Sequence, residues 1–231
     1  MKTLGLLGGM SWQSSLEYEK TINKLVNASQ GGVSSADLII RSFNFEIIEQ
    51  LQAENNWVAA GELLAGAAKQ LEDCGADAIV LCTNTMHKVA DRIEASISVP
   101  LIHIADVTGQ AILEQRLTKV ALLGTNFTMQ EGFYRDRLLE KFDITAIIPE
   151  ADERSEIHRI IYQELVQGKI IDASRDFMLE VIHNLTQQGA QGVIAGCTEI
   201  ELLVRPLDVA VPYFPTSFLH AKAAADFALR D

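Results

Sequence analysis

Short apolar runs alternate with longer amphipathic segments along the whole chain. The apolar runs predict eight strands, at residues 3–7, 37–42, 78–81, 101–104, 120–123, 145–148, 192–195 and 213–214. Helical periodicity occupies segments between them, for example residues 59–74, 88–96, 133–141, 156–166 and 175–188. Strands that are apolar on both faces and alternate with helices are typical of a parallel sheet covered on both sides. The pattern therefore predicts an α/β fold.

The sequence repeats itself at a spacing of about half its length. Residues 75–85 align without a gap on residues 189–199, at an offset of 114, and residues 4–9 align on residues 120–125, at an offset of 116. Matches in the same order at nearly one offset indicate a duplicated α/β unit. We therefore expect two pseudo-symmetric, Rossmann-like α/β domains, each with its own parallel sheet.

The expected domain boundaries follow from this repeat. The first domain comprises residues 1–103 and is completed by the C-terminal segment 214–231, while the second comprises residues 104–213. Ligands of open α/β sheets bind beyond the carboxyl ends of the strands, where helix N-termini offer backbone N–H groups to a carboxylate. We expect an interdomain active-site cleft lined by four such turns. These turns are residues 8–11, 82–85, 124–128 and 196–199.

Composition narrows the class of protein further. The 231 residues include 31 acidic and 19 basic side chains, and the formal charge of −12 disfavours nucleic acid and anionic membranes as partners. The three cysteines, Cys74, Cys82 and Cys197, form no CxxC pair, so we expect neither a disulfide framework nor a metal site. The first residues do not match a signal peptide, and no apolar run is long enough to span a bilayer. We expect a cytoplasmic protein.

One cysteine stands where reactive groups are found in α/β enzymes. Cys197 follows a predicted strand and precedes a predicted helix start at Thr198, and a helix N-terminus stabilises a thiolate, so we predict a lowered pKa. The repeat aligns Cys197 with Thr83 and not with the adjacent Cys82. Neighbouring side chains of a strand point to opposite faces. If Thr83 faces the ligand, Cys82 faces the packed side of the sheet, and we interpret it as structural.

The same turns resemble those of a known family, the aspartate/glutamate racemases, near its broad-specificity amino-acid racemases. The resemblance runs over most of the chain and is carried by residues 8–12 (GGMSW), 82–87 (CTNTMH), 123–125 (LGT), 149–152 (PEAD) and 196–199 (GCTE). Most relatives have Cys-Asn-Thr in the first catalytic turn and Gly-Cys-Thr in the second. Their two cysteines act on opposite sides of the substrate Cα without a cofactor. Here Thr83 stands where the first cysteine belongs.

The resemblance implies a cofactor-independent racemase of aspartate or glutamate, with Thr83 and Cys197 as the catalytic pair. Racemisation removes the Cα proton from one face and returns a proton on the other, which requires two opposed acid/base groups. A hydroxyl donates a proton more readily than it accepts one, so we expect the L enantiomers, L-aspartate and L-glutamate, to be preferred. We also expect a homodimer. The substrate-binding residues expected from the two turns and from the relatives are Met10, Gln52, Asn84, Thr85, Thr125, Thr198 and Glu199.

Several alternatives stay open at this point. His87 and Glu199 either orient a catalytic group or cap a helix, and the segment after Gln52 contains no arginine for a distal carboxylate. The architecture also suits other carbanion chemistry on small dicarboxylic acids, by an isomerase or a decarboxylase. Loss of the first cysteine would equally suit a metabolite-binding protein without catalysis. Nucleotide binding is disfavoured, because the glycines of residues 5–9 do not form GxGxxG.

Overall fold

The predicted strands form two separate sheets of four parallel strands each. The computed structural model describes residues 1–230 and divides into two compact units, residues 1–104 with the segment from His220 onwards, and residues 105–219. Strand order is β2-β1-β3-β4 in the first unit and β6-β5-β7-β8 in the second, so the two topologies are equivalent. The predicted α/β fold of two related domains is confirmed.

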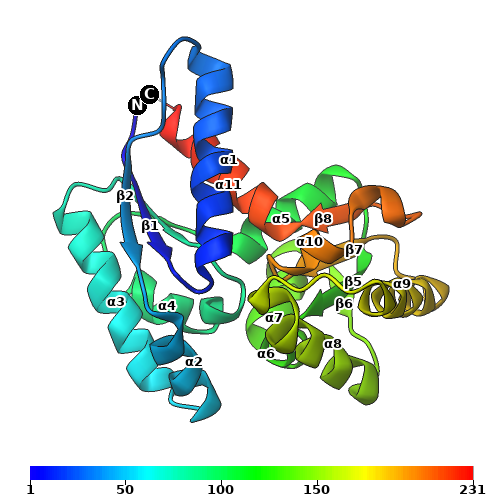
Figure 1. Cartoon of the computed structure of the whole chain (residues 1–231). Helices are drawn as coiled ribbons and strands as arrows, with labels where there is room; N and C mark the ends of the chain where they lie inside the picture. Colours follow the sequence, from blue (N-terminus) through cyan, green and yellow to red (C-terminus); the bar gives the residue numbers. More distant parts are fainter. Residues whose placement is uncertain (231) are drawn as a thin grey trace. The chain divides into compact units, whose positions relative to one another are not determined.

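The first unit (blue to green, with the red C-terminal helix, in Figure 1) places helices on both faces of its sheet. Its strands are β1 (Leu4–Gly8), β2 (Leu38–Ser42), β3 (Ala78–Leu81) and β4 (Leu101–Ile102). Its helices are α1 (Trp12–Gln30), α2 (Phe45–Ala53), α3 (Trp57–Asp73), the 3₁₀ helix η1 (Thr85–Val89), α4 (Ala90–Glu94) and most of α11 (Thr216–Ala228).

The second unit repeats this arrangement. Its strands are β5 (Lys119–Gly124), β6 (Thr145–Ile147), β7 (Val193–Gly196) and β8 (Tyr213–Pro215). Its helices are α5 (Ile104–Glu114), α6 (Asn126–Gln130), α7 (Gly132–Phe142), α8 (Ala151–Gln163), η2 (Leu165–Gln167), α9 (Asp172–Gln187), α10 (Ile200–Leu203) and η3 (Pro206–Asp208).

Side-chain alternation along the central strands divides the core of each unit. In β3, Ile79 and Leu81 pack with α2, α3 and α4, whereas Ala78 and Val80 pack with α1 and α11. In β7, Val193 and Ala195 pack with α8 and α9. Every strand contact is parallel, and burial on both faces explains why these strands are continuously apolar.

Two boundaries differ from the expected ones for physical reasons. Helix α8 begins at Ala151, five residues before the predicted start, because Glu150 and Glu153 form a reciprocal capping box. Strand β8 pairs with β7 in the second sheet, so residues 214–219 lie with the second unit and not with the first. The chain returns to the first unit only at His220.

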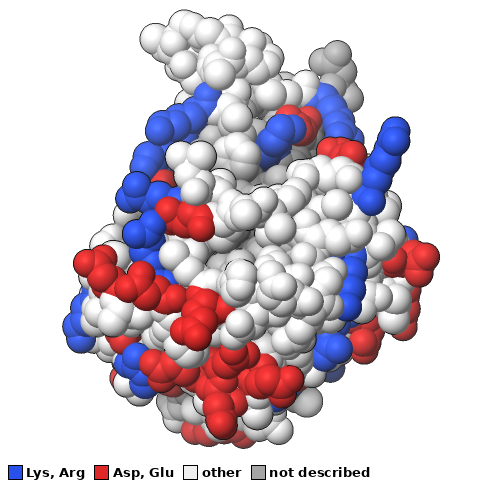
Figure 2. Space-filling model, turned by 90° about the vertical axis from the view of Figure 1, so that its right-hand side faces the viewer, with Lys and Arg blue, Asp and Glu red and all other residues white. Residues whose placement is uncertain are grey.

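The surface carries charges of both signs, as Figure 2 shows for one face. Asp and Glu gather over the lower part of that face, and Lys and Arg lie mainly towards its two sides. Within residues 1–230, no helix combines the length and the hydropathy needed to cross a membrane.

The turn after β1 depends on glycine. Gly9 has a φ of +86°, and a Cβ on it would lie 2.3 Å from the backbone nitrogen and oxygen of Phe43. We predict that Gly9→Ala lowers the free energy of unfolding by roughly 2–4 kcal/mol, because it adds a backbone clash to the unfavourable φ. Gly31 is the matched control, with a φ of +74° and no atom within 4 Å of an added Cβ. Urea unfolding should show a smaller loss for Gly31→Ala, and equal losses would contradict the clash.

Candidate active site

The turn after β3 separates its cysteine from its threonine. Cys82 is buried in the cluster beneath α1 and α11, with Sγ 3.6 Å from the carbonyl oxygen of Val80. Burial raises the pKa of the Cys82 thiol well above its usual range, so it stays protonated. Thr83, the next residue, is only half-buried. The packing predicted for Cys82 from strand alternation is confirmed.

The rest of this turn is polar and buried. Asn84 and Thr85 are both almost fully covered, and η1 begins at Thr85. Nδ1 of His87 lies 2.7 Å from the carbonyl oxygen of Thr83, and Nε2 of His87 accepts the backbone N–H of Ile104 at 3.2 Å. Because Nε2 accepts, Nδ1 carries the proton and donates to Thr83. His87 therefore connects this turn to the first residue of α5.

Two further expected binding residues of the first unit lie in its core beside the first turn. Met10 follows β1, which pairs with β3, and packs in the same cluster as Met86. Gln52, near the end of α2, is buried, and its amide nitrogen lies 2.9 Å from Sδ of Met86. The structure thus brings Met10 and Gln52 to the residue that follows Asn84 and Thr85.

The turn after β7 holds a thiol against a carboxylate. Sγ of Cys197 lies 3.1 Å from Oε2 of Glu199, and the hydroxyl of Thr198 donates to the same oxygen at 2.6 Å. Cys197 and Glu199 are both buried, with 8% and 6% of their surface exposed. The Glu199 side chain thus contacts the thiol. Glu199 also precedes α10, but its side chain makes no capping hydrogen bond to that helix.

The lowered pKa predicted for Cys197 is wrong. Burial raises the pKa of the thiol well above its usual range, and the Glu199 carboxylate adds to that rise by repulsion and by accepting the thiol proton. The backbone N–H groups of Glu199 and Ile200 act in the expected direction and lower the pKa, but they are outweighed. The resting group is a neutral thiol with a proton acceptor in contact.

Thr125 is the expected binding residue of the turn after β5. Its hydroxyl caps α6 by accepting the backbone N–H of Thr128 at 3.3 Å, and Oγ1 also lies 3.2 Å from Oγ1 of Thr128. The next residue, Asn126, donates its backbone N–H to Nδ1 of His158. Gly124 pairs with the last residue of β7, so this turn lies beside the turn that carries the thiol.

The sequence analysis missed Glu201, which lies four residues beyond Cys197 in α10. Its Oε1 accepts the backbone N–H of Ser217 at 3.1 Å and the Ser217 hydroxyl at 2.7 Å. Burial, with repulsion from Glu199, raises the pKa of Glu201 to about 7. The internal repeat contained a signal for this residue, because an offset of 114 aligns Glu201 with His87.

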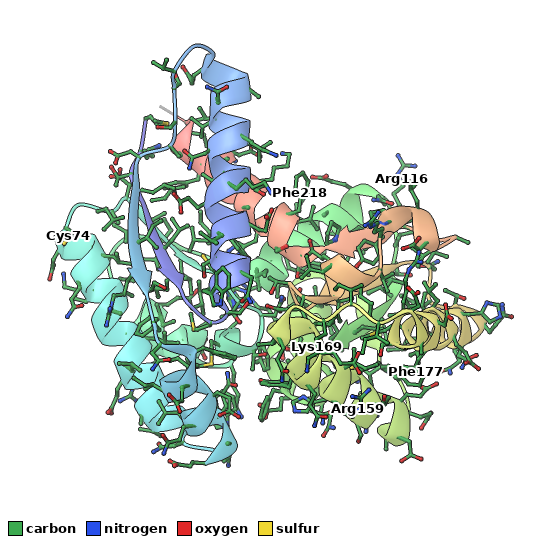
Figure 3. The ribbon with its side chains drawn as sticks, in the orientation of Figure 1. Cys74, Arg116, Arg159, Lys169, Phe177 and Phe218 are labelled. Carbon is green, nitrogen blue, oxygen red and sulfur yellow. The ribbon has the colours of Figure 1, made fainter. Side chains whose placement is uncertain are left out.

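Cys74 and Lys169 are two further polar residues, outside the four turns. Cys74, labelled in Figure 3, is exposed at the end of α3, before β3 begins. It thus lies at the opposite end of β3 from Thr83. Lys169, also labelled there, follows η2 and donates to the side chain of Gln167 at 2.7 Å. Among residues 1–230, no three His, Cys, Asp or Glu side chains are grouped to hold a metal ion.

Comparison with known proteins gives one consistent result. A family model described as Asp/Glu/hydantoin racemase matches residues 7–224. A crystal structure from Yersinia pestis, provisionally named an Asp/Glu racemase, is 53% identical with a TM-score of 0.94, and the two chains cover each other fully. An aspartate racemase homologue from Pyrococcus horikoshii is 33% identical with a TM-score of 0.86, again over both full chains. The broad specificity amino-acid racemase RacX of Bacillus subtilis is 25% identical over 70% of this chain and 68% of its own.

The raised pKa of Glu201 predicts a specific pH dependence of stability. An acid whose pKa is raised on folding binds its proton more tightly in the folded state, so its contribution is lost as pH rises from about 4.5 to about 7. Glu201→Gln cannot ionise. The free energy of unfolding of the variant, relative to that of wild type, should therefore rise by roughly 2 kcal/mol between pH 5 and pH 8. Urea unfolding measures both values. If the free energies of unfolding of the two proteins change with pH in parallel, the raised pKa of Glu201 is contradicted.

Proposed function

The chain belongs to the Asp/Glu/hydantoin racemase family and is an isomerase, and we propose that it racemises aspartate and glutamate without a cofactor, preferring the L enantiomers. The observation that supports this most directly is the buried contact between Cys197 and Glu199. A neutral thiol is a poor base, but a carboxylate that already accepts its proton allows a thiolate to form when substrate arrives. The backbone N–H groups of Glu199 and Ile200 then stabilise the thiolate charge.

The proposed reaction uses one thiol and one hydroxyl on the two faces of Cα. The Cys197 proton moves to Glu199, and the thiolate takes the Cα proton of the L substrate. Thr83 donates its hydroxyl proton to the opposite face, which gives the D enantiomer. One proton returns from Glu199 to Thr83 through solvent, so the cycle is balanced. Repulsion would disfavour a second buried anion beside Glu199, and proton transfer within the pair avoids it.

Stabilisation of the carbanion is assigned to the expected binding residues. Electron density that leaves Cα moves into the substrate carboxylate, which donors must neutralise. We propose Asn84, Thr85 and backbone N–H groups of their turn for this task, because they are buried donors directly after Thr83. Met10, Gln52, Thr125, Thr198 and Glu199 complete the proposed substrate site.

The proposal extends to the location and the assembly of the enzyme. We propose that the enzyme is a cytoplasmic homodimer that acts on free L-aspartate and L-glutamate. On α1, Trp12 and Leu16 stand one helical turn apart and are 63% and 53% exposed, which provides an apolar surface for a second copy.

Exchange of the Cα proton tests the function and the roles of the cysteines. We expect wild type to exchange the Cα proton of L-aspartate or L-glutamate in D₂O, and Cys197→Ala to reduce the rate at least about 10³-fold, because the variant lacks the thiol that takes this proton. Cys82→Ala should keep most of the activity and lose about 1 kcal/mol of stability, because it only leaves a small cavity. ¹H NMR follows the exchange. An inactive Cys82→Ala that remains folded, or an active Cys197→Ala, would overturn the assignment.

The difference between thiol and hydroxyl predicts a directional effect. The equilibrium constant between enantiomers is one, so kcat/KM must be equal in the two directions, and a preference shows in kcat and KM separately. A thiolate can return solvent deuterium to the face from which it took the proton. We therefore expect L substrate to exchange at least about tenfold faster than it inverts, and D substrate to show no exchange ahead of inversion.

Thr83→Cys is the matched variant for this effect. A second thiol can act as a base, so exchange of D substrate should then run ahead of its inversion. Chiral chromatography of samples analysed by NMR gives both rates. If the ratio of the exchange rate to the inversion rate in wild type is the same for both enantiomers, Thr83 does not limit the reaction.

A further inference from the structure

The chain passes between its two units at only two places within residues 1–230, and both are helical. The first is between residues 104 and 105, at the start of α5, and the second is between residues 219 and 220, within α11. Each of these helices begins shortly after the last strand of a sheet, β4 or β8 (labels in Figure 1). The first turns of α5 and α11 are therefore the points at which the chain leaves one sheet towards the other unit.

A buried side chain connects the first of these turns to the turn that carries Thr83. His87 donates from Nδ1 to the carbonyl oxygen of Thr83 at 2.7 Å and accepts the backbone N–H of Ile104, the first residue of α5, at 3.2 Å. Only 2% of the His87 surface is exposed. Both ring nitrogens are thus used, and a neutral imidazole with its proton on Nδ1 is the form that makes both bonds.

The second unit contains the same connection with different chemistry. Glu201 accepts the backbone N–H and the hydroxyl of Ser217, the second residue of α11. Glu201 lies in α10, whose first residue, Ile200, donates its backbone N–H to the carbonyl oxygen of Cys197. A carboxylate here holds the first turn of α11 to the turn that carries the thiol.

His87 and Glu201 occupy equivalent positions of the repeat. Each lies four residues after the proposed reacting residue, Thr83 or Cys197, and the offset between them is 114. The partners also correspond. Helix α5 begins at Ile104 and α11 begins one residue before Ser217, so each backbone donor lies two residues after the end of β4 or β8. Duplication has kept the acceptor and its backbone donor while the side chain itself differs.

The returning helix reinforces the first connection. His220, the first residue of α11 to lie in the first unit, donates from Nε2 to the carbonyl oxygen of Ile102 at 2.6 Å and accepts the Tyr18 hydroxyl on Nδ1 at 2.9 Å. Burial lowers the pKa of His220 to about 4, so the ring is neutral. The ring centroid of His87 lies 5.8 Å from that of His220 and 4.5 Å from that of His103. Both crossing segments are therefore fixed within one buried group of rings.

We propose that His87 and Glu201 are pseudo-equivalent positioning residues, each of which fixes the turn of one reacting group to the first turn of the helix by which the chain leaves that sheet. This inference rests on the proposed function, since it takes Thr83 and Cys197 as the reacting residues. His87 acts through Thr83 on proton delivery, and Glu201 acts through Cys197 on proton abstraction. Each residue therefore affects a different step of the same reaction.

Two half-mimics of histidine test the first connection. Asn reaches as far as Nδ1 and keeps a donor for Thr83, whereas Gln reaches as far as Nε2 and keeps an acceptor for Ile104. Both break the connection, so His87→Asn and His87→Gln should each slow inversion of the L substrate about tenfold or more, while exchange of its Cα proton continues near the wild-type rate. A loss of exchange and inversion by the same factor, or no loss of either, would overturn the role of His87.

Glu201 has a matched pair of variants. Glu201→Gln keeps an acceptor oxygen for the Ser217 backbone and should retain exchange within about threefold of wild type, whereas Glu201→Leu removes the acceptor and should slow exchange and inversion together, in kcat more than in KM. Lys222→Met, which breaks an exposed ion pair with Asp226 on α11, is the control for changes to that helix. Equal rates for Glu201→Gln and Glu201→Leu would overturn the role of Glu201.

The outcomes separate this inference from the proposed function. If wild type neither exchanges nor inverts aspartate or glutamate, the proposed function fails. If wild type is active, the His87 variants keep its ratio of exchange to inversion and Glu201→Leu keeps its rates, only the positioning roles fail. Circular dichroism and urea unfolding of every variant establish that it is folded. A Glu201 variant that does not fold is replaced by Ser217→Pro, which removes the backbone N–H that Glu201 accepts. A His87 variant that does not fold is replaced by Ile104→Pro, which removes the backbone N–H that His87 accepts. Unchanged exchange and inversion in both proline variants would also overturn the proposal.

Discussion

Alternation of side chains along β3 and β7 decides which groups of this protein can take part in chemistry. Ile79 and Leu81 point to one face of the first sheet, and Ala78, Val80 and Cys82 point to the other, where α1 and α11 cover them. The same period places Cys197 on the face of Val193 and Ala195. A shift of one residue would bury Thr83 and present a second thiol. The asymmetry between hydroxyl and thiol is thus a consequence of sheet register.

Burial gives Cys197 a constraint that a surface thiol does not have. Removal from water raises the pKa of the Cys197 thiol, and repulsion from the Glu199 carboxylate raises it further. A proton shared between Cys197 and Glu199 keeps the pair at one negative charge. The Thr198 hydroxyl and the backbone N–H groups that begin α10 stabilise that charge. The arrangement sets the number of protons in the turn before any substrate is present.

Much of the fold could be predicted from the sequence because the central strands of both sheets, β1, β3, β5 and β7, are buried. Apolar runs therefore marked these strands, and the repeat indicated the correspondence of Thr83 with Cys197. Contacts between residues distant in sequence could not be read in the same way. Glu201 meets Ser217 through the packing of α10 on α11, and the early start of α8 depends on the capping box of Glu150 with Glu153. The lowered pKa predicted for the Cys197 thiol was wrong because burial, together with repulsion from the Glu199 carboxylate, outweighs the backbone N–H groups at the start of a one-turn helix.

Duplication followed by divergence explains why the two halves share geometry and differ in chemistry. The backbone framework is retained: four parallel strands in the same order, a polar turn after the third, and a helix whose first turn donates a backbone N–H to a side chain just beyond that polar turn. In the first half the side chains are a hydroxyl, an amide and a neutral imidazole, none of which carries a negative charge. In the second half they are a thiol and two carboxylates. The proposed removal of a proton towards the second turn and its return from the first are consistent with this difference in chemistry between the two halves.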